Sequence, residues 1–132
     1  MKRFISTILV GFLLFSTITF LSGCGGGKPD DVSEQHYQYA LNAIAIADSY
    51  LDYGISASEA YSRIDNLYNR KDELPKTQFG DKTHAKDFMI ESDIVILWSA
   101  LGRADYEATS EIYDDIFECR NNLADIIGKE KR

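Results

Sequence analysis

The chain has few residues that would cross-link it, interrupt its helices or make it basic. Two cysteines and two prolines occur among its 132 residues. So few cysteines exclude a disulfide-rich scaffold, and so few prolines leave long segments free to form helices. Two histidines supply few general bases or metal ligands. Lysine plus arginine number 14 against 21 aspartates and glutamates, so nucleic acid and anionic lipid are poor partners.

Sequence signatures of catalysis are missing as well. The chain contains no Gly-x-Ser-x-Gly, phosphate-binding loop, dinucleotide fingerprint, His-Glu-x-x-His or Glu-x-x-His pattern. A chain of this length has room for one small domain, and most enzyme folds are larger. We therefore expect a protein without catalytic activity and without a cofactor.

Residues 1–23 have the layout of a secretory signal. Lys2 and Arg3 precede an uncharged apolar run over residues 4–21, and two small residues follow at 22–23. The run is roughly 18 residues long, which is also the length of a short membrane span. Hydropathy alone therefore leaves open whether the segment is a cleaved leader or a retained helix.

The residues around the first cysteine favour the cleaved leader. Leu21-Ser22-Gly23-Cys24 resembles the lipobox of bacterial lipoproteins, in which a branched apolar residue and two small residues precede a cysteine. The resemblance implies that a diacylglyceryl group is attached to Cys24, that the signal peptide of residues 1–23 is removed, and that acyl chains such as palmitate hold the mature protein on a membrane outside the cytoplasm. Two or three chains give stable attachment, because each buried methylene contributes about 0.8 kcal/mol.

Removal of the leader changes the charge of the chain and exposes a linker. It takes away Lys2 and Arg3 and leaves 12 basic against 21 acidic residues, a net charge of −9. Residues 24–30 contain three consecutive glycines, so we expect a flexible tether that spans about 15 Å. The sequence does not decide between the cell membrane and an outer membrane.

Residues 31–128 predict an all-α domain, because apolar residues recur there at helical spacing and no strand pattern competes. Short links make consecutive helices antiparallel neighbours, so we expect a small antiparallel four-helix bundle with a frayed tail at 129–132. Residues 94–101 are apolar almost all round and should be the most buried part of the fold. The predicted helices are 32–53, 57–73, 82–101 and 106–127.

Capping patterns define these boundaries. Asp31 with Glu34, and Ser56 with Glu59, form capping boxes at the first two helix starts. The predicted cap of the third helix is Asp81 or Thr83, and that of the fourth is Asp105. The predicted helix stops are Gly54, Pro75 and Gly128. On the last helix, Tyr106 and Thr109 are expected to face inward.

The two halves of the domain match at an offset of 48 residues. Seven identities fall within a 29-residue window: His36 with His84, Ile46 with Ile94, Gly54 with Gly102, Glu59 with Glu107, Ala60 with Ala108, Ser62 with Ser110 and Ile64 with Ile112. About two would be expected by chance. The pattern is typical either of two copies of one helix hairpin or of convergence on the residues that any hairpin needs.

Tyrosines are the candidate contact residues, because their side chains combine a large apolar body with a polar tip. Tyr39, Tyr50 and Tyr53 share a second face of the first predicted helix and are the candidates for binding a protein partner. The alternative is that all eight tyrosines only line the edge of the bundle core.

Other polar residues give weaker indications. His36 and His84 each begin a helix and are expected to be solvated, although His84, Asp87 and Glu91 are spaced to converge on one helix face as metal ligands. Cys119 is expected to be a buried, inert thiol. The acidic first half of the last helix predicts a solvated face or a docking surface for a cationic protein.

These features predict a lipid-anchored, extracytoplasmic helical protein that acts by protein–protein interaction in the cell envelope. The membrane is contacted through acylated Cys24, and a second envelope protein is the expected partner. The alternative is a lipoprotein that binds a small ligand or a metal. The sequence identifies neither the partner nor the ligand.

Overall fold

The computed structural model describes residues 27–77 and 82–132. Within them the chain forms four α-helices and no strand, which confirms the predicted all-α bundle. The helices are α2 (Glu34–Leu51), α3 (Ala57–Asn69), α4 (Asp87–Tyr106) and α5 (Ser110–Ile126), with a short 3₁₀ turn, η2 (Lys71–Glu73), after α3. The predicted signal peptide, the lipobox and Cys24 lie outside the described residues.

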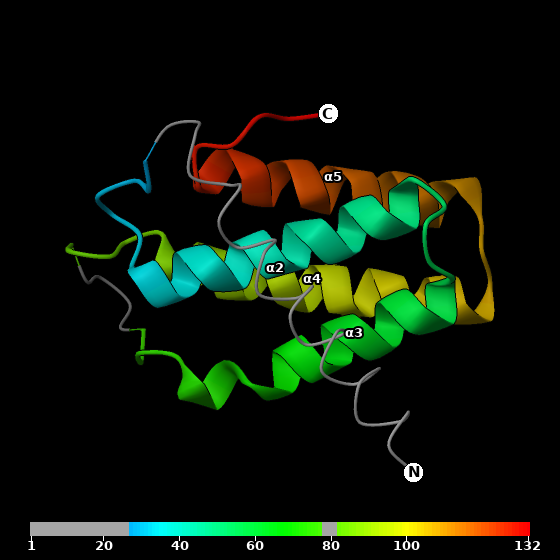
Figure 1. The fold of residues 1–132 in the computed structure, drawn as a ribbon, viewed down its shortest axis with the longest axis horizontal. Coiled ribbons are helices and arrows are strands. Elements are labelled where there is room, and N and C mark those ends of the chain that lie inside the picture. The colour runs from blue at the N-terminus through cyan, green and yellow to red at the C-terminus, as the bar shows by residue number, and fades with distance from the viewer. Residues whose placement is uncertain (1–26, 78–81) are drawn as a thin grey trace, which may run out of the picture.

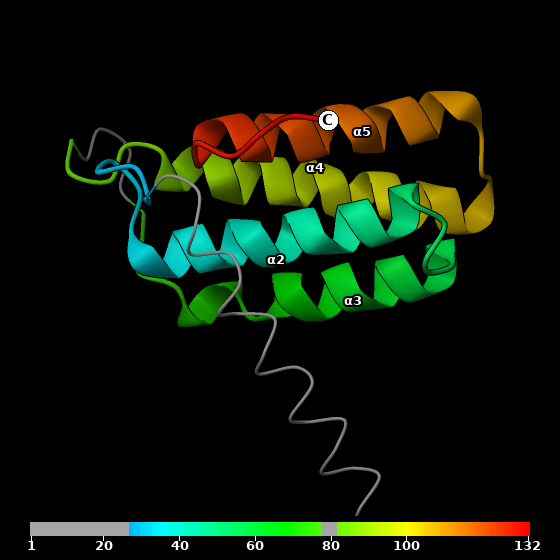
Figure 2. The same ribbon diagram turned by 45° about the horizontal axis from the view of Figure 1, so that its top comes forward.

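The four helices pack side by side, and each runs antiparallel to the one before it (Figure 1). Both α2 and α4 contact α3 and α5, and they also meet each other across the diagonal. Figure 2 shows α5 and α4 stacked above α2 and α3. This up-and-down order follows from links too short to cross the bundle.

Aliphatic side chains at helical spacing fill the centre. The fully buried large ones in α3, α4 and α5 are Ile64, Ile90, Ile94, Leu97, Leu101, Ile116 and Leu123. Opposite them α2 presents small side chains, with Ala40, Ala43 and Ala47 fully buried. Small residues on one helix allow its neighbours to approach closely, so the core is dense although the bundle is small.

The start of α2 differs from the prediction. The Ser33 hydroxyl caps this helix by accepting the backbone N–H of His36 at 3.3 Å. Asp31, the predicted cap, instead forms an ion pair with Lys86 at 3.4 Å. The predicted capping box of Asp31 with Glu34 is therefore wrong, because the aspartate is used in a contact between distant segments.

The link from α2 to α3 confirms one prediction and corrects another. The Ser56 hydroxyl accepts the Glu59 N–H at 3.1 Å, as predicted. At the end of α2, however, Tyr53 adopts the left-handed conformation, with φ of 59°, and Gly54 only donates its N–H to the Ser49 carbonyl at 2.8 Å. A non-glycine residue in this conformation costs roughly 1 kcal/mol, so Tyr53 occupies an unfavourable backbone position.

The start of α4 and the link to α5 lie later in the chain than predicted. Lys86 precedes α4 without a side-chain cap, which corrects the prediction for Thr83, whereas Asp81 lies outside the described residues. Because α4 continues to Tyr106, Gly102 lies inside the helix and is not a stop. The cap of α5 is Thr109, whose hydroxyl accepts the Ile112 N–H at 3.3 Å, and not Asp105. Tyr106 and Thr109 are consequently exposed, contrary to the prediction.

The offset of 48 residues does not bring equivalent positions into register. His36 is fully buried at the start of α2, whereas His84 lies in the link before α4. Ala60 is buried in α3, whereas Ala108 is exposed in the link before α5. Of the two alternatives that the sequence left open, these positions favour convergence on common helix residues over a duplicated hairpin in this register.

Residues 94–101 are buried on one side only. Ile94 and Leu97 have no exposed area, but Val95 is 41% exposed and Ile96 51%. The prediction that this run is buried all round is wrong, because α4 contacts the other three helices with one side alone. None of the described helices combines the length and the apolar content that a membrane span requires.

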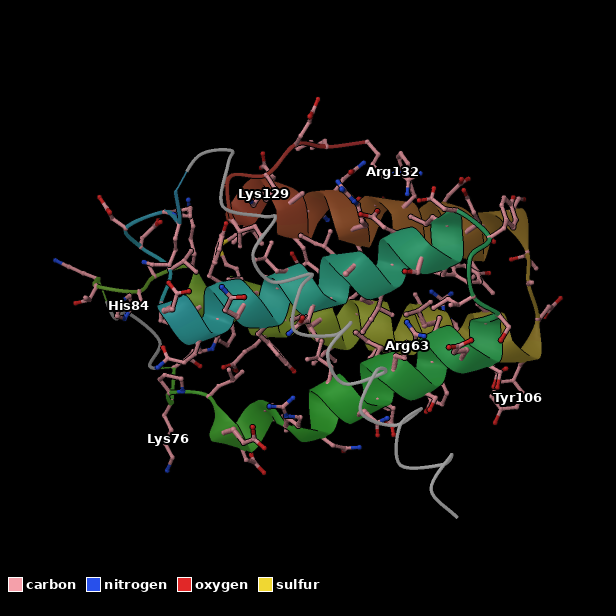
Figure 3. The ribbon with its side chains drawn as sticks, in the orientation of Figure 1. Arg63, Lys76, His84, Tyr106, Lys129 and Arg132 are labelled. Carbon is pink, nitrogen blue, oxygen red and sulfur yellow. The ribbon has the colours of Figure 1, made fainter. Side chains whose placement is uncertain are left out.

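Both ends of the described domain lie against it. The Lys28 amine donates to the Val32 carbonyl at 2.5 Å, so the folded domain begins before residue 31. At the other end the Arg132 guanidinium donates to Asp48 at 3.1 Å and also to Asp52 (Figure 3). These carboxylates of α2 and its C-cap contact the tail, and the fraying of residues 129–132 stays a prediction.

Candidate functional site

A buried polar cluster joins the start of α2 to the start of α4. The His36 ring has no exposed area. Its Nδ1 lies 2.8 Å from the Ser33 hydroxyl and 3.1 Å from an Asp87 carboxylate oxygen, and its Nε2 lies 2.7 Å from Glu91. Asp87, 3% exposed, also accepts the Ser33 N–H at 2.9 Å. The Thr77 hydroxyl lies 3.4 Å from the other Glu91 oxygen.

The cluster brings together residues that the sequence did not connect. Asp87 and Glu91 share a helix face, as their spacing indicated, but they meet His36 and not His84. Figure 3 shows His84 in the link at one end of the bundle. The prediction that both histidines are solvated is wrong for His36. More than fifty residues separate His36 from either carboxylate, so no local pattern could reveal the contact.

The geometry of this cluster suits a structural role. Each ring nitrogen of His36 lies within hydrogen-bond distance of a carboxylate, so the ring links Asp87 to Glu91. The Ser33 hydroxyl is buried and caps α2, so this Ser-His-carboxylate grouping is part of the start of the helix. Among the described residues no group of three His, Cys, Asp or Glu side chains is arranged to hold a metal ion. The cluster therefore sets the register of α2 against α4.

The outward side of α4 is apolar. Of the six large hydrophobic side chains that are exposed in the described part of the chain, five belong to α4: Phe88, Met89, Val95, Ile96 and Tyr106. Ser92 and Ser99 are exposed between them. We call the uncharged set Phe88, Met89, Ser92, Val95, Ile96 and Ser99 the α4 strip. Scattered exposed hydrophobics are ordinary, whereas a continuous strip on one helix indicates a contact surface.

A hollow between α3 and α4 continues the strip at its carboxyl-terminal end. It has a volume of about 220 Å³ and is lined mainly by Tyr61, Trp98, Gly102 and Tyr106. The absence of a side chain at Gly102 makes room there, since a Cβ would lie 3.1 Å from the Tyr61 ring. The Trp98 indole N–H donates to Asp65 at 2.9 Å, so this wall of the hollow is fixed in place.

The three candidate tyrosines do not form one surface. Tyr39 is only 5% exposed, Tyr50 is half-buried and Tyr53 is 86% exposed, with its ring 6.4 Å from that of Tyr113. Tyr39 is therefore removed from the candidate contact residues, because a buried ring cannot meet a partner. Tyr50 and Tyr53 stay a prediction. The α4 strip was missed because the apolar run within it reads as core in the sequence.

Two buried acids have raised pKa values. Burial, helped by the nearby charge of Glu91, raises the pKa of Tyr39 from 10.0 to about 12. Burial also raises the pKa of the Cys119 thiol to about 11, and Cys119 is 7% exposed. The predicted burial of Cys119 is confirmed, and a thiol that stays protonated at neutral pH is a poor nucleophile.

Alkaline pH is expected to destabilise the fold through Tyr39. The pKa of Tyr39 in the folded state lies above its unfolded value. The contribution of the protonated ring to the free energy of unfolding is therefore complete below about pH 10 and is lost as the pH rises towards about 12. We expect Tyr39→Phe in a Cys119→Ala background to reduce the loss of unfolding free energy over this range, measured by urea denaturation. Tyr106→Phe, which changes an exposed ring, should keep the original slope. Equal slopes for both variants would contradict the assignment.

A second groove lies between α2 and α3. Its volume is about 330 Å³, and the amides of Gln35, Gln38 and Asn42 border it above Leu67 and Leu74.

No family model matches the sequence, and no curated protein or solved structure matches it either. The function must therefore be inferred from the residues of this chain.

Proposed function

We propose that this chain is a lipid-anchored, extracytoplasmic protein that acts by binding another protein in the cell envelope, without catalysis and without a cofactor. The lipobox pattern of Leu21-Ser22-Gly23-Cys24 supports the anchor and the cleavage before the cysteine. The α4 strip is the observation that supports protein binding. A lipid anchor confines the domain to a membrane surface and raises its effective concentration near other envelope proteins.

The chemistry of the strip defines its partner. None of its six side chains carries a charge, although the domain as a whole is strongly acidic. An uncharged apolar strip buries well only against another apolar surface, because a charged partner would lose its hydration without finding a counter-ion. A strip on a single helix has the width that a second helix covers when side-chain ridges pack into grooves. The partner we propose is therefore the apolar face of a helix.

Photo-crosslinking in cells tests this proposal. A benzophenone amino acid in place of Ile96, which is 51% exposed, should yield a defined protein adduct that mass spectrometry identifies. The matched control is the same replacement at Ala45, an exposed residue of α2, which packs against α4 only across the diagonal. Adducts of equal kind and yield at both positions would remove the basis for a specific contact on α4.

Binding of a small ligand is the second candidate function, and the groove between α2 and α3 supports it. Its volume of about 330 Å³ is at the lower end for small-molecule sites, and its lining combines amides with the charged side chains of Glu34, Arg70 and Glu73, which suits a polar, hydrogen-bonding ligand. A ligand that binds only the folded state stabilises it by RT ln(1 + [L]/Kd), so the melting temperature rises with the ligand concentration. A thermal-shift screen with neutral sugars and short peptides, repeated on Asn42→Leu, distinguishes this function from protein binding.

A further inference from the structure

We propose that the α4 strip binds a second copy of this chain, with the two α4 helices packed antiparallel about a two-fold axis. This rests on the proposed function, in which the strip is a protein-binding surface. Three observations point to a second copy: the symmetry of the strip along the helix, the hollow at one of its ends, and the charges beyond both ends.

The strip is arranged symmetrically about its centre. Val95 and Ile96 occupy the middle, and Ser92 and Ser99 lie three residues to either side. A two-fold axis between residues 95 and 96 therefore places Val95 opposite Ile96 of the second copy, and Ser92 opposite Ser99. An interface between identical copies requires such a self-complementary surface. The small serines next to the centre permit close approach of the two helices.

The ends of the strip are complementary in shape. Phe88 and Tyr106 are 18 residues apart, which is about five helical turns, so both lie on the same line along α4. An antiparallel pair brings the Phe88 end of one copy to the Gly102 and Tyr106 end of the other. There the hollow of about 220 Å³ can receive a side chain that projects from the strip. With the axis between residues 95 and 96, Phe88 lies opposite Arg103, which also lines the hollow. Phe88 is 53% exposed and is the side chain that we assign to the hollow.

Charges beyond the strip favour the antiparallel arrangement. Lys82 precedes α4, whereas Asp105 and Glu107 lie at its carboxyl-terminal end; Lys86 and Arg103 are already paired within the domain, with Asp31 and Asp115. Antiparallel packing therefore sets Lys82 of each copy at the end where Asp105 and Glu107 of the other lie, which also opposes the helix dipoles. Repulsion between the acidic outer surfaces is screened beyond about 8 Å at physiological salt. A parallel pair would instead bring like charges together at both ends.

The membrane anchor is compatible with this pair. A two-fold axis keeps equivalent points of both copies at the same height along the axis. When the axis is normal to the membrane, both amino-terminal ends therefore face the same bilayer. Two anchored copies meet at a higher effective concentration than free ones, so a strip of this modest size is enough to hold them together.

Disulfide crosslinking of the full chain in cells tests the pairing. In a Cys119→Ala background that keeps Cys24, one tagged copy carries Ser92→Cys and a differently tagged copy carries Ser99→Cys. A disulfide needs Cα atoms about 4.4–6.8 Å apart, whereas two Ser92 positions in the antiparallel pair are separated by about 10 Å along the helix. We expect the mixed pair to crosslink at least about fivefold more than two Ser92→Cys copies. The matched control, Ala45→Cys on both copies, should give only background.

Each other outcome contradicts the inference in a different way. Stronger crosslinking between two Ser92→Cys copies would show parallel packing and overturn the antiparallel pair. Background crosslinking for all pairs, with an Ile96 photo-adduct to a different protein, would overturn the second copy as partner and leave the proposed function standing. Background crosslinking with no specific adduct at Ile96 would remove both.

Discussion

Asp87→Ala is expected to lower the free energy of unfolding by about 3 kcal/mol, because it leaves two buried polar groups without their hydrogen-bond partner. Asp87 is 3% exposed and accepts the Ser33 N–H at 2.9 Å while lying 3.1 Å from His36 Nδ1. Alanine leaves both partners buried without this acceptor and separates the start of α2 from the start of α4. For a domain of this size the melting temperature should fall by about 15 °C, measured by circular dichroism.

Two further variants separate the cost of the buried cluster from that of losing a charge. Glu59→Ala breaks the ion pair with Arg63 on the surface of α3, where the side chains are about half exposed, and should cost less than about 0.5 kcal/mol. A double variant, His36→Leu with Asp87→Leu, replaces both members of the buried pair with apolar side chains and should recover part of the loss. If Asp87→Ala costs no more than Glu59→Ala, the cluster does not set the register of α2 and α4.

Cys24→Ala is expected to abolish membrane attachment by acyl chains. If Cys24 is the acylated residue, its removal leaves no thiol at the lipobox for the diacylglyceryl group, and the precursor should keep its leader. Each acyl methylene contributes about 0.8 kcal/mol to membrane binding, so the loss of two or three chains is decisive. Fractionation into detergent and aqueous phases, with intact-mass measurement, reads out both the modification and the cleavage.

The other cysteine supplies the control for this experiment. Cys119→Ala should leave the lipidated, processed form in the detergent phase, because Cys119 is buried in α5. The lipobox prediction would be wrong if Cys24→Ala still partitioned with detergent at the mass of the mature protein. It would also be wrong if the Cys24→Ala product differed from the wild-type product only by the mass of one sulfur atom.

The anchor and the α4 strip together describe how such a protein could work. Acyl chains on Cys24 would place the domain at a membrane, and the strip would select what it meets there. The His36 cluster contributes indirectly, because Asp87 and Glu91 hold the amino-terminal half of α4 against α2. With its inner side held in this way, α4 presents its outer side to a partner as a rigid surface.

Local sequence patterns determined the class of fold. Helical spacing of apolar residues, the cap at Ser56 and the scarcity of proline were enough to predict an antiparallel bundle of helices. The buried position of Cys119 also follows from its phase with Ile112 and Ile116. These features are local, because a helix and its cap depend on residues within a few positions of one another.

The exact ends of the helices depended on contacts between distant segments. Asp31 has the sequence context of a helix cap, yet it pairs with Lys86, and Ser33 takes its place. Gly102 has the context of a stop, yet α4 continues past it, because buried Leu101 and Ala104 continue its packing. The gain from burying these side chains exceeds the local preference of glycine, which is about 1 kcal/mol.

The two surfaces of greatest interest were decided by the tertiary structure alone. In the sequence Val95 and Ile96 are indistinguishable from core residues, and they are exposed because no helix of the described ranges 27–77 and 82–132 covers their side. His36 meets Asp87 because packing brings together helix starts that are far apart in the chain. The residues themselves determined the helices and the lipobox pattern, since both are local. Whether one side of a helix is buried depends on which other helices pack against it. Only the packing of the four helices determined this.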